Sequence, residues 1–259
     1  NKVDSVEKTQ IIDGTARFVD DHTVAVDTAE GEKLFKADRI FINTGATPFV
    51  PPVEGLTIGG AIHTSETIMN LEEYPESLVI IGSGFIGLEF AATYAQFGTK
   101  VTVVDVIDTF LPREDEDVAQ AVKEQLEALG VTFNLGVQLK AVHQEGGKAV
   151  VEATTGEGAP AAFTADAVLV ATGRRANVQG LDLDKAGVEL TERGAIKVNE
   201  FLQTNVPHIF AMGDVNGGPQ FTFVSLDDFR IVKRFLAGDT TYSTKQRAKF
   251  PTATFINPP

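Results

Sequence analysis

The sequence predicts an α/β protein organised around a parallel β-sheet, and three features support this prediction. The apolar run at residues 78–81 leads directly into the glycine-rich turn Gly-Ser-Gly-Phe-Ile-Gly at 82–87. A helical pattern of apolar residues follows the turn, and a β-rich run at 101–104 follows the helix. Strand, glycine turn, helix and strand in that order are the pattern of a β-α-β unit, whose two strands lie parallel.

Each glycine of the turn has its own mechanical role. Gly82 makes the tight turn out of the strand, Gly84 lets the backbone approach a pyrophosphate, and Gly87 lets the helix pack close to the strand. The free N–H groups at the start of the helix, around Ile86, face the phosphates, and the positive end of the helix dipole favours their charge. The turn therefore predicts a dinucleotide site in a Rossmann-like unit.

An acid at the end of the second strand bears on which nucleotide is bound. Asp105 comes about 20 residues after Gly84, the offset expected for the acid that accepts a hydrogen bond from the ribose 2′-hydroxyl. A carboxylate there repels a 2′-phosphate, and the residues that follow, Val106, Ile107 and Asp108, include no Arg or Lys. We therefore expect NAD(H) to be preferred over NADP(H).

The rest of this unit follows from apolar periodicity. The first helix is expected to bury one face, and a second helix is expected at about 115–129. A short helix is expected earlier, at 64–73. A third parallel strand is expected at 131–133, an antiparallel meander at 137–165 and a buried strand at 168–171, which ends in the turn Thr172-Gly173-Arg174. The apolar residues at helical spacing in the first helix are Ile86, Phe90, Tyr94 and Phe97.

Two further turns lie outside this unit. Short β-rich runs at residues 10–44 lead into Thr44-Gly45, and a short apolar run before Gly213-Asp214 ends in an acid. A carboxylate at the carboxyl end of a strand can accept a hydrogen bond from a polyol hydroxyl. An Asp in a capping turn is an equally good interpretation of Asp214, and the residues alone leave both open.

Composition excludes several classes of function. A formal net charge of −14 makes nucleic acid and anionic membranes poor partners. No apolar segment is long enough to span a membrane and no secretory signal is present, so the sequence predicts a cytoplasmic protein. The chain has no cysteine, which excludes disulfides and thiolate sites within it. Four histidines show no ligand spacing, so no metal site is expected; they are His22, His63, His143 and His208.

Taken together, these motifs resemble the pyridine nucleotide-disulfide oxidoreductases, flavoproteins of the glutathione reductase, lipoamide dehydrogenase and mercuric reductase type. The matching segments occur in the family's order and span essentially the whole chain. They are the Thr44-Gly45 turn, the 82–89 fingerprint, the turn at 171–175 and the segment 204–214.

The resemblance implies an NAD(P) domain inserted into an FAD domain of similar fold. The FAD domain then comprises residues 1–70 and 178–247, the NAD(P) domain 71–177, and the start of a dimerisation domain 248–259. Asp214 would hydrogen-bond the ribityl chain of FAD. Phe85 would occupy the place of a tyrosine that gates the nicotinamide pocket, and Glu89 would lie beside the nicotinamide, where the family's acid pairs with a lysine.

The resemblance also implies that the chain is a fragment. The family's FAD fingerprint and its cysteine pair belong upstream of Asn1, and residues 255–259 resemble the opening strand of the dimerisation domain. We therefore expect an incomplete FAD site that binds FAD weakly or not at all, in a fragment that binds NAD(H) without turnover. The parent is expected to be a homodimer.

For the parent, the resemblance implies electron flow from NADH through FAD to a cysteine pair and then to a substrate. That substrate would be a disulfide, a mercuric ion, or a reactive halogen species or hypothiocyanous acid. Two alternatives stay open: a flavin-dependent NADH oxidase or peroxidase without a dithiol, and a dinucleotide-binding module without catalysis. Small-molecule nucleotides are the expected partners in each case.

Overall fold

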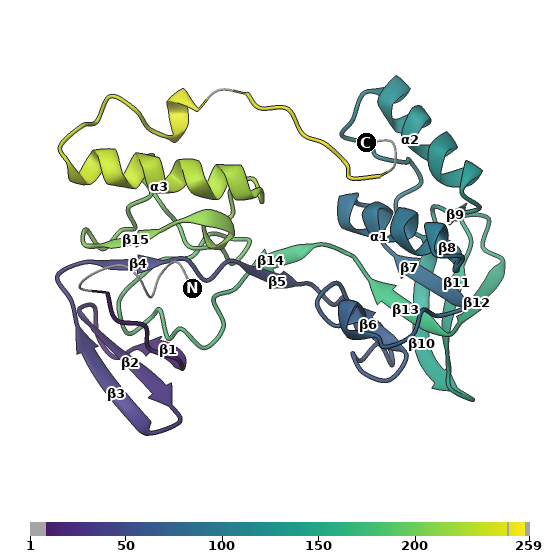
Figure 1. The fold of residues 1–259 in the computed structure, drawn as a ribbon, viewed down its shortest axis with the longest axis horizontal. Helices are drawn as coiled ribbons and strands as arrows, with labels where there is room; N and C mark the ends of the chain where they lie inside the picture. Colours follow the sequence, from purple (N-terminus) through teal and green to yellow (C-terminus); the bar gives the residue numbers. More distant parts are fainter. Residues whose placement is uncertain (1–8, 248, 257–259) are drawn as a thin grey trace. The chain divides into compact units, whose positions relative to one another are not determined.

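The computed structural model describes residues 9–247 and 249–256, and the chain folds into two compact units. Unit 1 comprises Asn1–Thr47 and Arg175–Lys249, and unit 2 comprises Pro48–Arg174 and Phe250–Pro259. Most of unit 2 is therefore inserted into the chain of unit 1, as the colours of Figure 1 show. The sequence places the first boundary near residue 71, whereas this division falls at Pro48.

Unit 2 is built on a five-stranded parallel sheet with the order β6-β13-β7-β8-β9. The chain runs from the central strand β7 outward through β8 to β9, and later returns to the other side of β7 with β13. This reversal is the kind of topological switch point at which open α/β sheets bind ligands. The strands are β6 (Ile62–Thr64), β7 (Ser77–Ile81), β8 (Lys100–Val104), β9 (Thr132–Asn134) and β13 (Ala167–Val170).

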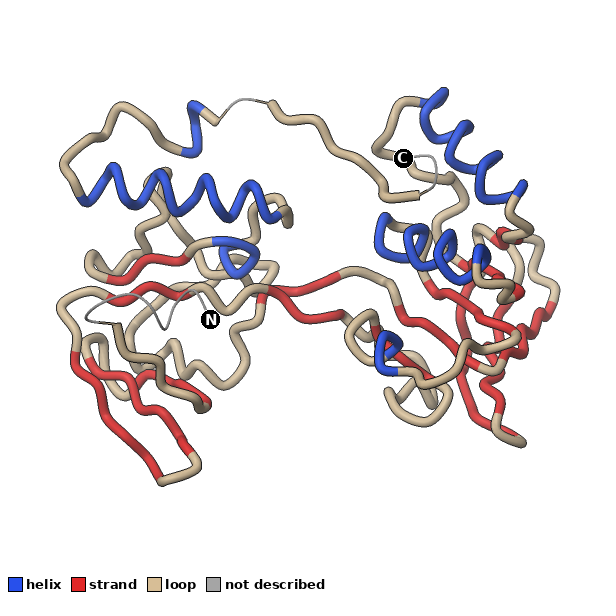
Figure 2. The backbone as a smooth tube through the Cα atoms, in the orientation of Figure 1, coloured by secondary structure: helices blue, strands red, loops and turns tan. Residues whose placement is uncertain are grey.

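The parallel sheet is the middle of three layers in unit 2 (Figure 2). Leu78 and Ile80 of β7 pack in one core with α1 (Phe85–Gln96) and α2 (Glu116–Ala128). Val79 and Ile81 pack in a second core with the antiparallel meander on the opposite face. Because both faces are buried, the strand is a continuous apolar run. The meander strands are β10 (Gln138–Glu145), β11 (Lys148–Thr154) and β12 (Pro160–Ala165).

The face that α1 buries differs from the expected one. Tyr94 is buried as expected, but Phe97 is 55% exposed. The buried face consists mainly of small residues near Gly87, including Ala91 and Ala92. A helix that packs close to its strand presents its smallest residues to that strand, so Phe97 at the end of the helix is left exposed.

The helix expected at 64–73 is wrong. Thr64 ends β6, and only a short 3-10 helix, Ile68–Asn70, follows. The Oγ1 of Thr67 accepts a hydrogen bond from the N–H of Thr64 at 3.0 Å, and the Oγ1 of Thr64 accepts one from the N–H of Glu66 at 3.3 Å. These hydroxyls bind backbone groups locally and so compete with a helix.

Unit 1 contains a parallel pair of strands, β4 (Ile40–Ile42) and β15 (Ile209–Ala211). Ile209 and Ala211 face one core, whereas Phe210 packs against α3 (Thr222–Leu236) in another. A separate antiparallel sheet consists of β1 (Thr15–Phe18), β2 (Thr23–Thr28) and β3 (Gly31–Lys36). The short strands β5 (Ala46–Pro48) and β14 (Arg174–Ala176) pair where the chain passes between the units.

The last part of the chain differs from the expected opening strand of a dimerisation domain. Residues 249–256 form no strand, and Ile256 is buried in the helix-side core of unit 2. Ala248 and residues 257–259 lie outside the described residues, as do the first eight residues of the predicted FAD domain. Within the described residues, none of the helices combines the length and the apolar character needed to cross a membrane.

Candidate functional site

The glycine turn of unit 2 has the geometry that its sequence predicts. Gly82 has φ of +110°, and a Cβ there would lie 2.5 Å from the carbonyl oxygen of Ala171. A Cβ on Gly87 would lie 2.2 Å from the carbonyl oxygen of Gly82. A Cβ on Gly84, by contrast, would have nothing within 4 Å. Gly82 and Gly87 are therefore required by the fold, whereas the space over Gly84 is open to a ligand.

The start of α1 offers backbone donors to that space. Gly84 is the N-cap residue, and no side chain caps the helix. The first bond that closes the helix is donated by the N–H of Leu88 to the carbonyl of Gly84, at 3.0 Å. The N–H groups of Phe85, Ile86 and Gly87 precede it and belong to the first turn, whose donors have no partner inside a helix. Together with the helix dipole, they suit an anionic group such as a pyrophosphate.

Asp105 lies directly after β8, and its carboxylate holds the glycine turn. Oδ2 accepts hydrogen bonds from both the N–H and the hydroxyl of Ser83, each at 2.6 Å. Oδ1 accepts one from the N–H of Ile107 at 3.0 Å. The sequence analysis missed Ser83, although a small hydroxyl residue between the first two glycines was a signal that could have found it. A ribose hydroxyl bound here would donate to the carboxylate of Asp105, which already accepts hydrogen bonds from the glycine turn.

The turn after β13 lies at the same edge of the sheet, because β13 and β7 are parallel neighbours. The hydroxyl of Thr172 donates to the carbonyl of Phe49 at 2.7 Å, and the N–H of Phe49 donates to the carbonyl of Gly173 at 2.9 Å. Arg174 donates to Glu66 at 3.3 Å. The side chains of Thr172 and Arg174 thus hold the turn in place through contacts within the protein. These contacts do not indicate that either side chain binds a ligand.

Two residues of α1 were predicted to lie nearest the reacting ring of the nucleotide. Phe85 is half-buried against the helix-side core. Glu89 is half-buried one turn later, and its Oε1 accepts a hydrogen bond from the N–H of Phe255 at 3.0 Å. The sequence could not predict this partner, which is 166 positions away.

Unit 1 has a comparable arrangement at the carboxyl ends of β4 and β15. Thr44-Gly45 follows β4, and Gly213-Asp214 follows β15, its parallel neighbour. Gly213 has φ of +70°, and a Cβ there would lie 2.8 Å from the Oγ of Ser225. Among the described residues, the half-buried carboxylate of Asp214 has no hydrogen-bond partner. A free acid at this edge suits the polyol interpretation of Asp214 better than the capping one.

A second acid that the sequence analysis missed orients the Gly213 turn. Asp228 of α3 is 2% exposed, and its Oδ2 accepts hydrogen bonds from the N–H of Gly213 at 2.9 Å and from the amide of Asn216 at 3.0 Å. Its other oxygen pairs with Arg247, which also donates to Asp227 at 2.7 Å. Burial opposes the charge of Arg247, but the hydrogen bonds to Asp228 and Asp227 outweigh it and raise its pKa.

The Thr44-Gly45 turn is fixed by Asn177, the residue that follows β14. The hydroxyl of Thr44 donates to the carbonyl of Asn177 at 2.7 Å, and the side-chain amide of Asn177 donates to the carbonyl of Thr44 at 3.3 Å. The N–H of Asn177 donates to the carbonyl of Gly45 at 2.9 Å. Both predicted turns of unit 1 are therefore held by neighbours that only the fold brings to them.

The fold and the glycine turns define an α/β protein with Rossmann-like features, and comparison with known proteins makes the class more specific. The family model described as pyridine nucleotide-disulphide oxidoreductase matches residues 2–228. The chain belongs to the pyridine nucleotide-disulphide oxidoreductase family. The resemblance stated from the motifs is confirmed.

Among curated relatives, the chain is similar to the probable pyridine nucleotide-disulfide oxidoreductase RclA of Escherichia coli, with 40% identity over 249 residues. That alignment covers 96% of this chain and 55% of RclA. A dihydrolipoyl dehydrogenase of Mycobacterium tuberculosis is 35% identical, over 95% of this chain and 53% of its own length. The chain thus spans about half the length of the curated relatives it matches.

Solved structures confirm the predicted α/β fold class. The structure described as HOCl-induced flavoprotein disulfide reductase RclA from Escherichia coli has a TM-score of 0.89 at 38% identity, over 96% of this chain and 55% of that one. LpdA from Mycobacterium tuberculosis has a TM-score of 0.85 at 26% identity, over 96% of this chain and 54% of its own.

Proposed function

We propose that unit 2 binds NADH through the 82–87 turn, the start of α1 and Asp105. One observation carries the proposal: Gly84 is the only glycine of the turn over which a Cβ would meet nothing, and it lies where the N–H groups of α1 begin. Gly82, Gly84, Ile86 and Gly87 would supply the backbone surface for the pyrophosphate, as such turns do in Rossmann-like units.

The preference for NADH over NADPH rests on Asp105 and its surroundings. Its carboxylate lies at the carboxyl end of β8, and the exposed residues that follow, Val106 and Ile107, carry no charge. A carboxylate accepts a hydrogen bond from the 2′-hydroxyl of NADH and repels the 2′-phosphate of NADPH. No cation follows it directly to compensate.

Titration of the chain with each nucleotide tests this proposal. The fluorescence of NADH and of NADPH reports binding directly, and the chain has no tryptophan to interfere. We expect saturable binding of NADH and weaker binding of NADPH. Equal affinities would contradict the preference, and absence of saturable NADH binding would contradict the site itself.

For the whole protein, we propose NADH-dependent flavoprotein oxidoreductase activity. Unit 1 would hold FAD, with Asp214 accepting a hydrogen bond from the ribityl chain and the Thr44-Gly45 and Gly213 turns lying close to it. The carboxylate of Asp214, which has no hydrogen-bond partner in the part of the chain that the structure describes, fits such a hydroxyl. A bound flavin supplies hydride acceptance and onward electron transfer. Phe85 and Glu89 would lie nearest the nicotinamide, and Thr172, Gly173 and Arg174 would border the nucleotide.

The terminal acceptor is proposed from the relatives. They include a disulfide reductase induced by HOCl and dihydrolipoyl dehydrogenases, which favours transfer through a cysteine pair to a disulfide-type or reactive-halogen substrate. A mercuric substrate and a homodimer are proposed from the motif resemblance alone. A flavin oxidase or peroxidase without a dithiol is the alternative, and a non-catalytic nucleotide-binding module is another. Counting cysteines in the full-length protein separates the first from the second, and an NADH-dependent reductase assay of that protein separates both from the third.

We propose that the 259-residue chain alone binds FAD weakly or not at all and has no turnover. Its single Gly-x-Gly-x-x-Gly turn is in unit 2, so we expect the described residues of unit 1 to offer no comparable phosphate cradle. Purification of the chain in the presence of FAD tests this. We expect a colourless protein, and an absorbance band near ~450 nm, which reports bound flavin, would contradict the proposal.

A further inference from the structure

The fold of unit 1 brings together two histidines that lie far apart in the sequence. His22 lies just before β2 and His208 just before β15, and their rings stack with centroids 3.8 Å apart and planes within 3° of parallel. One ring nitrogen of each and one carboxylate oxygen of Asp21 all lie within 4.8 Å of one another. Asp21 and His208 are 187 positions apart, which is why no ligand spacing appears in the sequence.

Main-chain carbonyls determine which ring nitrogen of each histidine is free. Nδ1 of His22 lies 2.9 Å from the carbonyl oxygen of Ala37, and Nε2 of His208 lies 2.7 Å from that of Asp21. A carbonyl oxygen only accepts hydrogen bonds, so each of these nitrogens carries the hydrogen. In the neutral rings, the lone pairs are then on Nε2 of His22 and Nδ1 of His208. Metal-binding histidines are held by carbonyls in this way.

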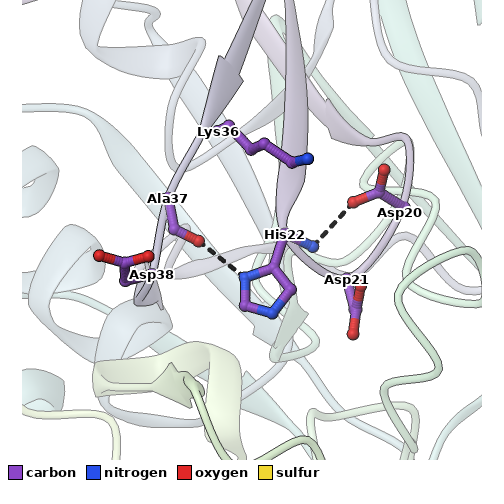
Figure 3. A pocket seen from close by; sticks show the side chains of 6 residues that line it. All are labelled: Asp20, Asp21, His22, Lys36, Ala37 and Asp38. Atoms are coloured by element: carbon purple, nitrogen blue, oxygen red, sulfur yellow. Dashed lines mark hydrogen bonds between the residues drawn. The ribbon is translucent and has the colours of Figure 1, made fainter.

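The surroundings of the pair are acidic. Figure 3 shows His22 in its pocket between Ala37 and Asp21, and the hydrogen bond from its backbone N–H to Asp20. Asp20, Asp21 and Asp38 line the pocket against one cation, Lys36. This excess of carboxylates over cations favours a bound cation over an anion.

We propose that Asp21, His22 and His208 form a binding site for a divalent transition-metal ion such as Zn²⁺. Two imidazole nitrogens and one carboxylate oxygen, with water in the remaining position, are a donor set that Zn²⁺, Ni²⁺ and Cu²⁺ accept. Mg²⁺ and Ca²⁺ prefer oxygen ligands throughout, so the site discriminates against them.

Binding rearranges the histidine pair. Tetrahedral ligands at about 2.0–2.2 Å from one ion lie about 3.3–3.6 Å from each other, so any two donor atoms that lie near the 4.8 Å limit move closer together. The ion also lies in the plane of each ring that binds it, which two parallel rings cannot both satisfy. One ring therefore turns out of the stack. The ion then joins the turn before β2 to the segment before β15 and stabilises unit 1 by mass action.

Histidine side-chain ¹H–¹⁵N spectra recorded during titration with ZnCl₂ test the proposal on the unaltered chain. Only four histidines contribute signals. We expect one equivalent of Zn²⁺ to shift the ring signals of His22 and His208 and to leave those of His63 and His143 in place. MgCl₂ should shift none of them. If the His22 and His208 signals do not move, or move with MgCl₂ as well, the proposal is wrong.

Matched variants identify the ligands by calorimetry. In His22→Asn and His208→Gln, the new amide can still donate to the carbonyl of Ala37 or Asp21, so the hydrogen bond is kept and the ligand is lost. Each should lower Zn²⁺ affinity at least about tenfold. His143 lies 3.8 Å from Glu152 and is the competing histidine–carboxylate pair, so His143→Gln is the control and should change nothing. Unchanged affinity in His22→Asn, or an equal loss in His143→Gln, would overturn the assignment. NADH binding by unit 2 does not enter either measurement.

Discussion

The backbone N–H and the hydroxyl of Ser83 donate to the same carboxylate oxygen of Asp105, each at 2.6 Å. The acid expected to recognise the ribose thus also holds the glycine turn that would bind the pyrophosphate. Oδ1 of Asp105, which accepts only from the N–H of Ile107, still has a lone pair for a ligand, since an ionised carboxylate can accept about four hydrogen bonds, two on each oxygen. Recognition of the sugar and shape of the phosphate loop therefore depend on one side chain.

Replacement of Asp105 by Asn should relax the nucleotide preference. The amide oxygen can still accept from the N–H of Ser83, but the charge that repels a 2′-phosphate is gone. We expect the ratio of NADPH to NADH affinity to rise about tenfold, equivalent to ~1.4 kcal/mol, as measured by nucleotide fluorescence. Ser83→Ala is the control: it weakens the loop but keeps the charge, so the ratio should hold. An unchanged ratio in Asp105→Asn would remove Asp105 from the proposed role.

Alanine at two glycines of the same turn should have opposite effects. In Gly87→Ala the new methyl lies 2.2 Å from the carbonyl oxygen of Gly82 and 3.3 Å from Ile80, so we expect a loss of about 1–3 kcal/mol in unfolding free energy. In Gly84→Ala the methyl meets nothing and φ is −75°, so stability should stay within about 0.5 kcal/mol. NADH binding should nevertheless be lost. Urea unfolding and NADH titration of both variants give the comparison, and tight NADH binding by Gly84→Ala would refute the predicted approach of the pyrophosphate.

Stability of unit 2 should contain an acid-sensitive contribution from Asp166. Lys148 and the hydroxyl of Ser77 hydrogen-bond its carboxylate, each at 2.6 Å, and lower its pKa from 3.8 to about 2. Because the folded state holds the proton more weakly than the unfolded state, this contribution is complete above pH 3.8 and is lost as the pH falls toward 2. Asp166→Asn should therefore be less stable than the wild type at pH 6, with the difference shrinking between pH 4 and 2. A difference that does not depend on pH over this range would show that the charge is not involved.

The buried pair of Arg247 and Asp228 should contribute far more to stability than the exposed pair of Arg234 and Asp239, which also has one partner on α3. Arg247→Met leaves Asp228, which is 2% exposed, without its cation, and we expect a loss of about 3–5 kcal/mol in urea unfolding. Arg234→Met removes the pair with Asp239, whose side chains are 46% and 36% exposed, and should cost about 1 kcal/mol or less. Similar losses in the two variants would contradict the importance assigned to burial.

Sequence reasoning succeeded where the constraint is local. The roles of Gly82 and Gly87 follow from the chain's own turn, and the strands on both sides of it form at the expected residues. The same reasoning failed for Phe97, because helix rotation is set by close packing on the sheet rather than by the period of large residues. It also failed at residues 64–73, where hydroxyls of Thr64 and Thr67 bind the backbone instead.

The site residues that were missed have partners far along the chain. Ser83 meets Asp105 across the β-α-β unit, and Asp228 meets Gly213 only after α3 has packed. The same holds for the contact between Glu89 and Phe255, 166 positions apart. No local pattern contains such pairs, so a motif can identify the turn but not the residue that orients it.

The hydrogen bond from Phe49 to Gly173 bears on whether the inserted segment can be removed from the chain. It joins residues one position inside each end of the inserted segment at 2.9 Å, while Asn177 and Gly45 join the flanking chain at the same distance. Among the described residues, every core residue of unit 2 except Ile256 comes from within that segment. Residues 48–174 therefore form an insert whose two ends lie next to each other. The two ends of the flanking chain that remain after its removal also lie next to each other. A few linker residues could reseal the flanking chain after excision.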